Sequence, residues 1–253
     1  MPRKRRMKSS TEMYHVMVKG INKEKIFNQN REKSYFKKII LKHLEKYAVD
    51  IYGYCIMSNH AHFIIRAEIQ TLSYFMAAIL AEYASYYNYK HKRNGHVFQN
   101  RFKSECIEDV KYYWACLRYI HLNPVKAHMI QKVERYKYSS IGEYITHANL
   151  LLSRKAIDLF LKEFENNQEF LDYHGYVGEN IFIDVKDEME MRRVEVATEV
   201  LKRMRKEKQL KLLYQIFEEK VYREEYIIEL QRKLNIAQKA AKELCEKVRN
   251  LIE

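Results

Sequence analysis

The segment Asp50–Ala67 has the sequence DIYGYCIMSNHAHFIIRA. Its two apolar stretches, residues 50–57 and 60–67, are rich in Ile, Tyr and Phe and predict two β-strands joined as a hairpin by a tight Ser58-Asn59 connection. Side chains alternate between the two faces of a strand, so His60 and His62 leave the second strand on the same side. The segment therefore predicts a hairpin that holds two imidazoles about one metal-ion width apart.

The segments around this hairpin supply the other elements of an α+β domain. We predict a strand at residues 14–20, a helix at residues 31–48, a helix from Thr71 to about Lys90, a strand near residues 102–107 and a helix that opens after Asp109 and ends at Pro124. The resulting βαββαβ order is typical of a ferredoxin-like sandwich, in which an antiparallel sheet is backed by helices. The expected fold class is therefore α+β with a ferredoxin-like unit, followed by a C-terminal all-helical module.

The chain is expected to have four parts: a basic N-terminal arm (residues 1–13), a catalytic domain (14–148), a helical connector (149–188) and a C-terminal helical module (189–253). Residues 136–145 are expected to form a loop that packs back on the catalytic domain, and residues 150–173 to be helical. In the last module, residues 224–235 and 237–248 fit the helices of a degenerate helix-turn-helix, although the turn lacks the usual glycine. A plain helical bundle and a dimerising coil remain alternatives.

Charge is the main compositional signal. The chain of 253 residues has 46 Lys and Arg against 33 Asp and Glu, a formal net charge of +13, which favours a nucleic acid or an anionic surface as partner. Its 21 tyrosines suit stacking on single-stranded bases. No apolar run spans a bilayer, the charged N-terminus is not a secretory signal, and the 4 cysteines are spaced like reduced thiols. We expect a cytoplasmic protein without a membrane partner.

A second motif, Arg118-Tyr119-Ile120-His121-Leu122-Asn123-Pro124, lies about sixty residues after the histidine pair. Tyr119 and Asn123 are four residues apart and share one face of the predicted helix. Two histidines need a third ligand, which the Asn123 amide oxygen can supply; imidazoles suit Mn, Zn, Ni or Cu, and Mg less well. Attack of Tyr119 on a DNA phosphodiester would conserve the bond energy in a phosphotyrosine, so that rejoining needs no ATP. Taken alone, a structural histidine pair and a core tyrosine are the competing interpretations.

Four segments together carry a family resemblance: HVMVKGIN, YCIMSNHAHFII, GHVFQNRFKSE and LRYIHLNPVKA. From about Met1 to Tyr144 the chain closely resembles the single-tyrosine HUH transposases of small bacterial insertion sequences, nearest the branch linked to repetitive extragenic palindromes (REP). The resemblance implies that His60 and His62 are metal ligands, that Asn123 is the third ligand and that Tyr119 is the nucleophile. It further implies a divalent ion (Mg²⁺ or Mn²⁺), a tyrosine joined to a DNA 5′ phosphate, a free 3′ hydroxyl, and single-stranded DNA beside hairpins as substrate.

Residues outside this core are candidates for DNA contacts, with a solvated surface charge as the competing interpretation of each. Lys19 stands where relatives commonly have Arg before the glycine. The arm can hold the foot of a hairpin, and the segment before the last strand can contact phosphates or bases. The residues concerned are Arg3, Lys4, Arg5, Arg6, Gln99, Arg101 and Lys103. His15 and His121 are expected to be structural, because His121 is only two residues from Tyr119 and faces elsewhere.

The expected function is that of a DNA transposase, an endonuclease and strand transferase that cleaves and rejoins single-stranded DNA at hairpin or palindromic ends. The alternative is a host-adapted protein that binds palindromic DNA with little or no mobilising activity. A replication initiator or relaxase is disfavoured, because such proteins usually have larger chains and more histidine ligands. Both a homodimer and a monomer are compatible with the sequence.

Overall fold

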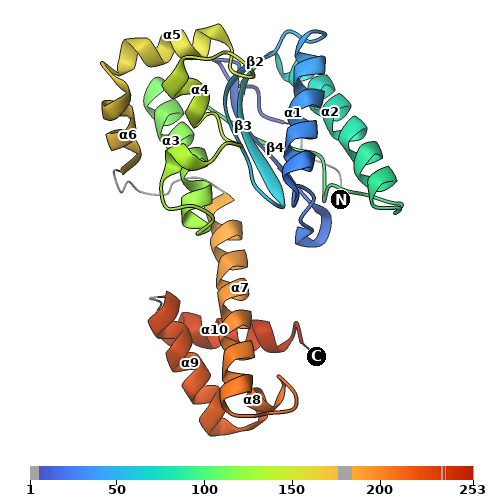
Figure 1. The fold of residues 1–253 in the computed structure, drawn as a ribbon, viewed down its shortest axis with the longest axis vertical. Helices are drawn as coiled ribbons and strands as arrows, with labels where there is room; N and C mark the ends of the chain where they lie inside the picture. The colour runs from blue at the N-terminus through green and yellow to red at the C-terminus, as the bar shows by residue number, and fades with distance from the viewer. Residues whose placement is uncertain (1–5, 176–183, 235, 237, 253) are drawn as a thin grey trace. The chain divides into compact units, whose positions relative to one another are not determined.

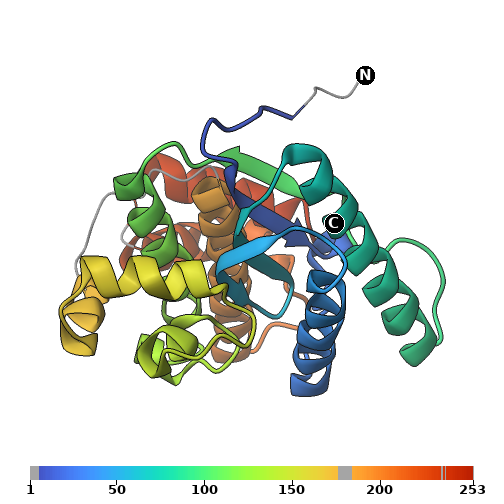
Figure 2. The ribbon, with the colours of Figure 1, turned by 90° about the horizontal axis from the view of Figure 1, so that it is seen from above.

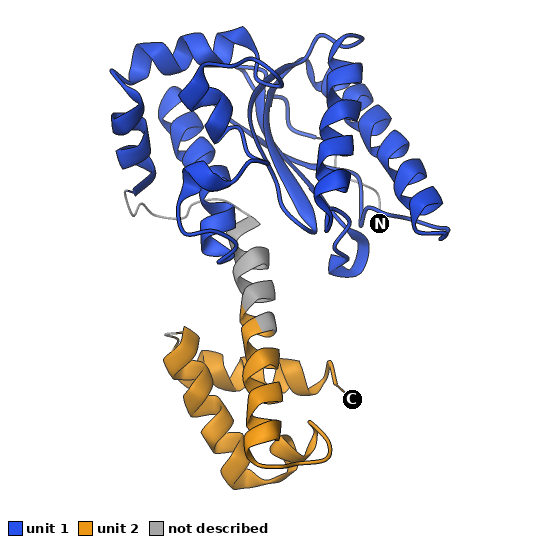
Figure 3. Ribbon diagram, in the orientation of Figure 1, with its two compact units in different colours: residues 1–178 blue, residues 179–253 orange. Residues whose placement is uncertain are grey.

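A computed structural model describes residues 6–175, 184–234, 236 and 238–252, without the side chains of residues 184–192 and 195. The chain divides into two compact units, residues 1–178 and residues 179–253 (Figure 3). The first unit contains the predicted catalytic domain, and residues 149–175 of the predicted connector also belong to it. Arg3, Lys4 and Arg5 of the basic arm lie outside the described residues.

A four-stranded antiparallel sheet forms the centre of the first unit. Its strands are β1 (Met13–Lys19), β2 (Asp50–Ile56), β3 (His60–Arg66) and β4 (Lys103–Cys106), arranged in the order β2-β3-β1-β4. Ile56 pairs with Ala61 across the Ser58-Asn59 connection, which confirms the predicted hairpin. With α1 (Asn30–Leu44) and α2 (Ile69–Lys90) the element order is βαββαβ, and the α+β prediction is confirmed.

The helices cover both faces of the sheet (Figures 1 and 2). On one face lie α1 and α2, and the Phe36 ring of α1 meets the Phe63 ring of β3 at 6.2 Å between centroids. On the other face lies α3 (Val110–Lys126), whose Tyr119 ring is 5.8 Å from that of His62. Phe63 and His62 are neighbours in sequence, so strand alternation directs one to the apolar core under α1 and the other to α3.

The helix α3 begins where the sequence predicts and ends later. The Asp109 side chain accepts a hydrogen bond of 2.7 Å from the Tyr112 amide and caps the first turn. The predicted end at Pro124 is wrong, because the helix continues to Lys126. Pro124 cannot donate a hydrogen bond to Ile120 O, but the Ala127 amide still donates to Asn123 O at 2.9 Å, which continues the helix past the proline.

Gly53 of β2 allows α3 to approach the sheet closely. A Cβ atom there would lie 2.5 Å from Leu117 Cδ1 and 3.3 Å from Ile120 Cδ1, and both leucine and isoleucine are fully buried. We expect Gly53→Ala to destabilise the first unit by about 1–3 kcal/mol, because the buried Leu117 and Ile120 side chains must shift to relieve the overlap. Chemical denaturation followed by the fluorescence of Trp114, the only tryptophan in the chain, measures this unit. Gly142→Ala is the control, since a Cβ there meets nothing within 4 Å; an equal effect of the two changes would contradict the packing argument.

Residues 127–175 wrap around β2 and α3. They form η2 (Val133–Arg135), α4 (Ile141–Thr146), α5 (Arg154–Glu163) and α6 (Asn167–Gly175). The predicted return of residues 136–145 onto the sheet is observed, since the Ser140 amide donates to Tyr54 O and the Ile56 amide to Tyr138 O, both at 2.9 Å. The second half of this predicted loop is the helix α4. The predicted helical stretch of residues 150–173 contains two helices, α5 and α6, rather than one.

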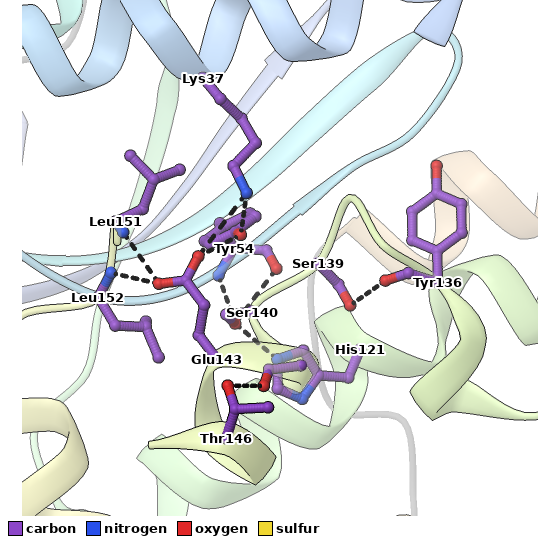
Figure 4. A network of polar contacts seen from close by, with 11 residues as sticks. Lys37, Tyr54, His121, Tyr136, Ser139, Ser140, Glu143, Thr146, Leu151 and Leu152 are labelled. Carbon is purple, nitrogen blue, oxygen red and sulfur yellow. Dashed lines mark hydrogen bonds and ion pairs between the residues drawn. The ribbon is translucent and has the colours of Figure 1, made fainter. Parts of the chain in front are cut away.

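A buried carboxylate, Glu143 of α4, ties this region to the sheet and to α1 (Figure 4). One carboxylate oxygen accepts a hydrogen bond of 2.6 Å from Tyr54 Oη, and Lys37 Nζ lies 3.7 Å away. The other accepts from the amides of Leu151 and Leu152 at 2.9 and 3.0 Å. Burial lowers the pKa of the Lys37 ammonium, although Glu143 opposes the shift.

A stacked histidine pair attaches α6 to α3. His121 Nδ1 and His174 Nε2 are 2.9 Å apart, His174 Nδ1 donates to Phe170 O at 2.7 Å, and Ser140 Oγ lies 2.7 Å from His121 Nε2. Since His174 Nδ1 holds its proton, His174 Nε2 accepts from His121, and His121 Nε2 accepts from the serine. The arrangement needs both rings neutral. Burial lowers the pKa of His174 to about 4, to which nearby Arg118 contributes, and lowers that of His121 well below its usual value.

The first unit is therefore expected to lose stability in acid. The unfolded chain takes up protons near the usual histidine pKa of about 6.5, whereas native His174 resists protonation until about pH 4. The free energy of unfolding that this pKa difference contributes is therefore fully present above about pH 6.5 and decreases as the pH falls toward 4. Between about pH 7.5 and pH 5, His174 alone contributes a loss of about 2 kcal/mol. Denaturation of His174→Gln at both pH values, followed by Trp114 fluorescence, should show a smaller loss than wild type. An equally reduced loss of stability in His96→Gln, which changes an exposed histidine, would contradict the assignment of the acid sensitivity to His174.

The second unit has its own hydrophobic core. It consists of α7 (Asp184–Glu207), α8 (Gln215–Glu218), α9 (Lys220–Leu234) and α10 (Gln238–Arg249), and Tyr226 Oη donates to Ala197 O at 2.8 Å between α9 and α7. The predicted all-helical module is confirmed. Because residues 235 and 237 lie outside the described residues, the helix-turn-helix stays a prediction. No helix in the described part of the chain is long and apolar enough to cross a membrane.

Candidate active site

The two histidines of β3 lie on the face of the sheet that α3 covers. His60 pairs with Lys19 of β1 and His62 with Met17, so both imidazoles leave the strand in the same direction. Their ring centroids are 4.9 Å apart and the rings are nearly perpendicular. His62 is fully buried and His60 is 7% exposed.

Tyr119 of α3 lies beside this pair. Its ring is 5.8 Å from that of His62, and the contact is edge-on. Asn123 follows one turn later on the same helix, and each of the two side chains is 4% exposed. The structure thus brings together His60, His62 and Tyr119, while Asn123 is buried on the helix that carries the tyrosine.

Hydrogen bonds set the orientation of both imidazoles. His60 Nδ1 lies 2.6 Å from Asn59 Oδ1 and donates its proton to this acceptor, so the lone pair of the ring is on Nε2. His62 Nδ1 lies 3.0 Å from Nε2 of His15, the next histidine on the sheet. Each ring therefore has its Nδ1 hydrogen-bonded within the protein, and Nε2 is the nitrogen that we consider as a metal ligand.

The donor set fits a divalent metal ion. Nδ2 of Asn123 is buried without a hydrogen-bond partner among the described residues, and an amide can present either its oxygen or its nitrogen to a ligand. Two imidazoles and one amide oxygen suit Mn²⁺ well and Mg²⁺ less well. Among the described residues no cluster of three or more His, Cys, Asp and Glu side chains could hold a metal ion. The candidate site is therefore the set of His60, His62 and Asn123.

Three lysines lie close to the histidines and the tyrosine. Lys19 of β1 is directly opposite His60. Lys103 of β4 is opposite Met17 of β1, and Met17 is opposite His62. Because residues directly opposite in an antiparallel sheet share a face, Lys19 and Lys103 lie on the face of the two histidines. Lys126 Nζ lies 4.9 Å from the centroid of the Tyr119 ring. These cations can offset the charge of a phosphodiester brought to the tyrosine.

The remaining predicted DNA contacts lie toward the edge of the sheet. Gln99, Arg101 and Lys103 are exposed, and the Gln99 amide donates to Lys19 O at 2.9 Å. Arg6 is half-buried, with its guanidinium carbon 3.8 Å from the centroid of the Phe102 ring, so it holds the arm against this segment. His121 faces away from the site toward Ser140 and His174, as its spacing from Tyr119 predicts.

Two residues of this region are missing from the sequence prediction of the site. His15, which the sequence predicts as structural, stacks on His62 with ring centroids 5.2 Å apart, and its Nδ1 lies 3.9 Å from Glu105 Oε2. Strand alternation places His15 on the face of Lys19. Only the register of β1 against β3 and β4 brings it to His62 and Glu105, and the sequence alone does not give this register.

The comparisons with known proteins agree with this picture. The model of the family described as "Transposase IS200 like" matches residues 8–123, slightly less than half of the chain. The matched segment holds the whole sheet, the histidine pair, Tyr119 and Asn123. Over this segment the chain is therefore similar to IS200-like transposases.

One solved structure is also similar. It is described as "Structure of the REP associates tyrosine transposase bound to a REP hairpin", with 18% sequence identity, a TM-score of 0.49, and coverage of 59% of this chain and 88% of that chain. A comparison with curated proteins gave no match.

Proposed function

We propose that the chain carries a transposase domain that cleaves and rejoins single-stranded DNA through a covalent bond to Tyr119, with the help of a divalent ion, Mg²⁺ or Mn²⁺. The observation that carries the proposal is the contact of the Tyr119 ring with His62, within the segment that is similar to IS200-like transposases. The excess of basic residues fits a DNA partner. The resemblance of the four sequence motifs to REP-linked relatives makes hairpin or palindromic ends the expected substrate.

In this proposal Tyr119 Oη attacks the phosphorus of a phosphodiester. The new O–P bond links the tyrosine to the 5′ phosphate, the bond from phosphorus to the 3′ oxygen breaks, and the proton lost by the tyrosine is made up on the released 3′ hydroxyl through solvent. The attack of a 3′ hydroxyl on the phosphotyrosine reverses these changes and restores the free tyrosine. No ATP is consumed, because the bond energy is kept in the intermediate.

The side chains of the site have separate roles in this reaction. His60, His62 and Asn123 would hold the divalent ion, which when bound polarises a phosphoryl oxygen and offsets the charge that develops on it. Lys19, Lys103 and Lys126 would orient the DNA backbone by their positive charge.

The burial of Tyr119, at 4% exposure, favours a second candidate function. A phosphodiester can react with Tyr119 Oη only if DNA gains access to this largely buried side chain. A protein in which DNA never gains this access would bind palindromic DNA without cutting it, which is the host-adapted alternative.

The experiment uses end-labelled single-stranded hairpin oligonucleotides from the DNA that flanks the gene. The full chain is incubated with them in Mg²⁺, Mn²⁺ or EDTA, beside His62→Ala and the matched control His43→Ala, a largely buried histidine that pairs with Glu82 between α1 and α2. We expect a denaturant-resistant protein–DNA adduct with either ion, none in EDTA, loss in His62→Ala and retention in His43→Ala. Tight hairpin binding with no adduct under either ion would support the binding protein instead.

A further inference from the structure

A row of three polar side chains crosses the sheet behind the proposed metal site. Glu105 of β4 is directly opposite His15 of β1, and His15 is diagonal to His62 of β3, since its direct partner is Ile64. All three side chains lie on the face that α3 covers. His15 is 2% exposed and His62 is fully buried, so water competes little for their ring nitrogens.

The charge of Glu105 determines how the protons in this row are placed. Oε2 of Glu105 lies 3.9 Å from His15 Nδ1, an electrostatic contact rather than a close hydrogen bond. The interaction with His15 is the main cause that holds the pKa of the Glu105 carboxyl below its usual value, and a hydrogen bond from Tyr112 of α3 adds to it against the effect of burial. Glu105 is thus a carboxylate, and a carboxylate favours the His15 tautomer whose proton on Nδ1 faces it.

The tautomer of His15 then fixes that of His62. With its proton on Nδ1, a neutral His15 offers a lone pair on Nε2, which is 3.0 Å from His62 Nδ1. His62 must donate from Nδ1 to this acceptor, and its own lone pair is then on Nε2. If instead His15 Nε2 donated to His62 Nδ1, a neutral His62 would carry its proton on Nε2 and could not ligate a metal through that atom.

We propose that Glu105 and His15 form a proton-orienting relay that fixes His62 in the tautomer competent for metal binding. The relay rests on the proposed function, because it gives His62 Nε2 the role of a metal ligand. Glu105 and His15 are positioning residues, which act through His62 and do not contact the DNA. His60 reaches the same tautomer by a shorter route, through the side-chain oxygen of its neighbour Asn59.

Two measurements on the full chain test the relay. The first is the tautomeric state of His62 in the metal-free protein, read from the ¹⁵N chemical shifts of histidine-labelled protein, with His62→Gln to assign the signal. We expect His62 of the wild type to be protonated on Nδ1 and unprotonated on Nε2, and His62 of His15→Leu to be a mixture of the two tautomers. A wild-type His62 protonated on Nε2 overturns the relay.

The second measurement is Mn²⁺ affinity by calorimetric titration without DNA. We expect His15→Leu and Glu105→Gln each to weaken binding by about tenfold, the lower end of the range for residues that orient metal ligands. The matched controls are His43→Leu and Glu82→Gln, which alter a carboxylate–histidine pair on α1 and α2 and should leave the affinity unchanged.

The outcomes separate the relay from the metal site itself. Wild-type binding that His62→Gln abolishes, with unchanged affinity in His15→Leu and Glu105→Gln, overturns the relay alone. If the wild type binds no Mn²⁺, or if His62→Gln binds Mn²⁺ as tightly as the wild type does, the metal site of the proposed function is overturned, and the relay with it. A loss of affinity shared by the control pair identifies general destabilisation and also overturns the relay.

Discussion

Replacement of Tyr119 by phenylalanine is expected to abolish adduct formation and to lower the rate of hairpin cleavage by at least about a thousandfold. Phenylalanine keeps the ring that meets His62 and His15 at 5.8 and 6.0 Å, so the packing of α3 on the sheet is retained. It removes only the oxygen that would attack phosphorus. Hairpin affinity should therefore stay at the wild-type level while the covalent adduct disappears. A denaturing gel with labelled DNA measures the adduct, and a filter-binding titration measures affinity.

The matched control is Tyr89→Phe, a tyrosine of α2 that is 88% exposed. It should form the adduct at the wild-type rate, which would exclude adventitious attachment through this exposed phenol. Cleavage that persists in Tyr119→Phe at a comparable rate would move the nucleophile to another residue and remove the central step of the proposal.

The sequence predicts the strands and the start of α3, because side-chain alternation and helix capping depend only on residues close together in the chain. The alternation in residues 60–67 places His60 and His62 on one face, and the Asp109 cap marks the start of α3. The end of α3 at Lys126 is missed because a proline predicts the end of a helix, whereas the hydrogen bond from the Ala127 amide to Asn123 O continues α3 past Pro124. The helix α4 is missed because its six residues are stabilised by contacts with the sheet rather than by their own periodicity.

The site shows the same division between local and long-range information. The four-residue spacing of Tyr119 and Asn123 is helical geometry, which the sequence contains. The approach of α3 to the sheet depends on the absence of a Cβ at Gly53, far away in sequence. The neighbours of His62 depend on strand register: a shift of β1 by one residue would turn His15 to the opposite face and break the row from Glu105 to His62.

The largest expected effect on stability is that of Glu143→Ala. The carboxylate accepts hydrogen bonds from Tyr54 Oη and from the amides of Leu151 and Leu152, and it faces the half-buried Lys37. Alanine leaves these donors without their acceptor and the half-buried ammonium without its counter-charge. Loss of one partner of such a network costs about 3–5 kcal/mol, a large share of the stability of one domain. Urea denaturation followed by Trp114 fluorescence measures the loss in the first unit.

Glu143→Gln separates the charge from the hydrogen bonds. Its amide oxygen still accepts from the two leucine amides, but its NH₂ group meets Tyr54 Oη, which already accepts from Lys37 Nζ at 2.7 Å. The glutamine variant should therefore lie between wild type and alanine, and the double variant Lys37→Met/Glu143→Gln should recover part of the loss, because it removes the uncompensated cation. If the double variant were as unstable as the sum of its single changes, the ion pair would contribute nothing, and the stability of this region would come from the hydrogen bonds of Glu143 alone.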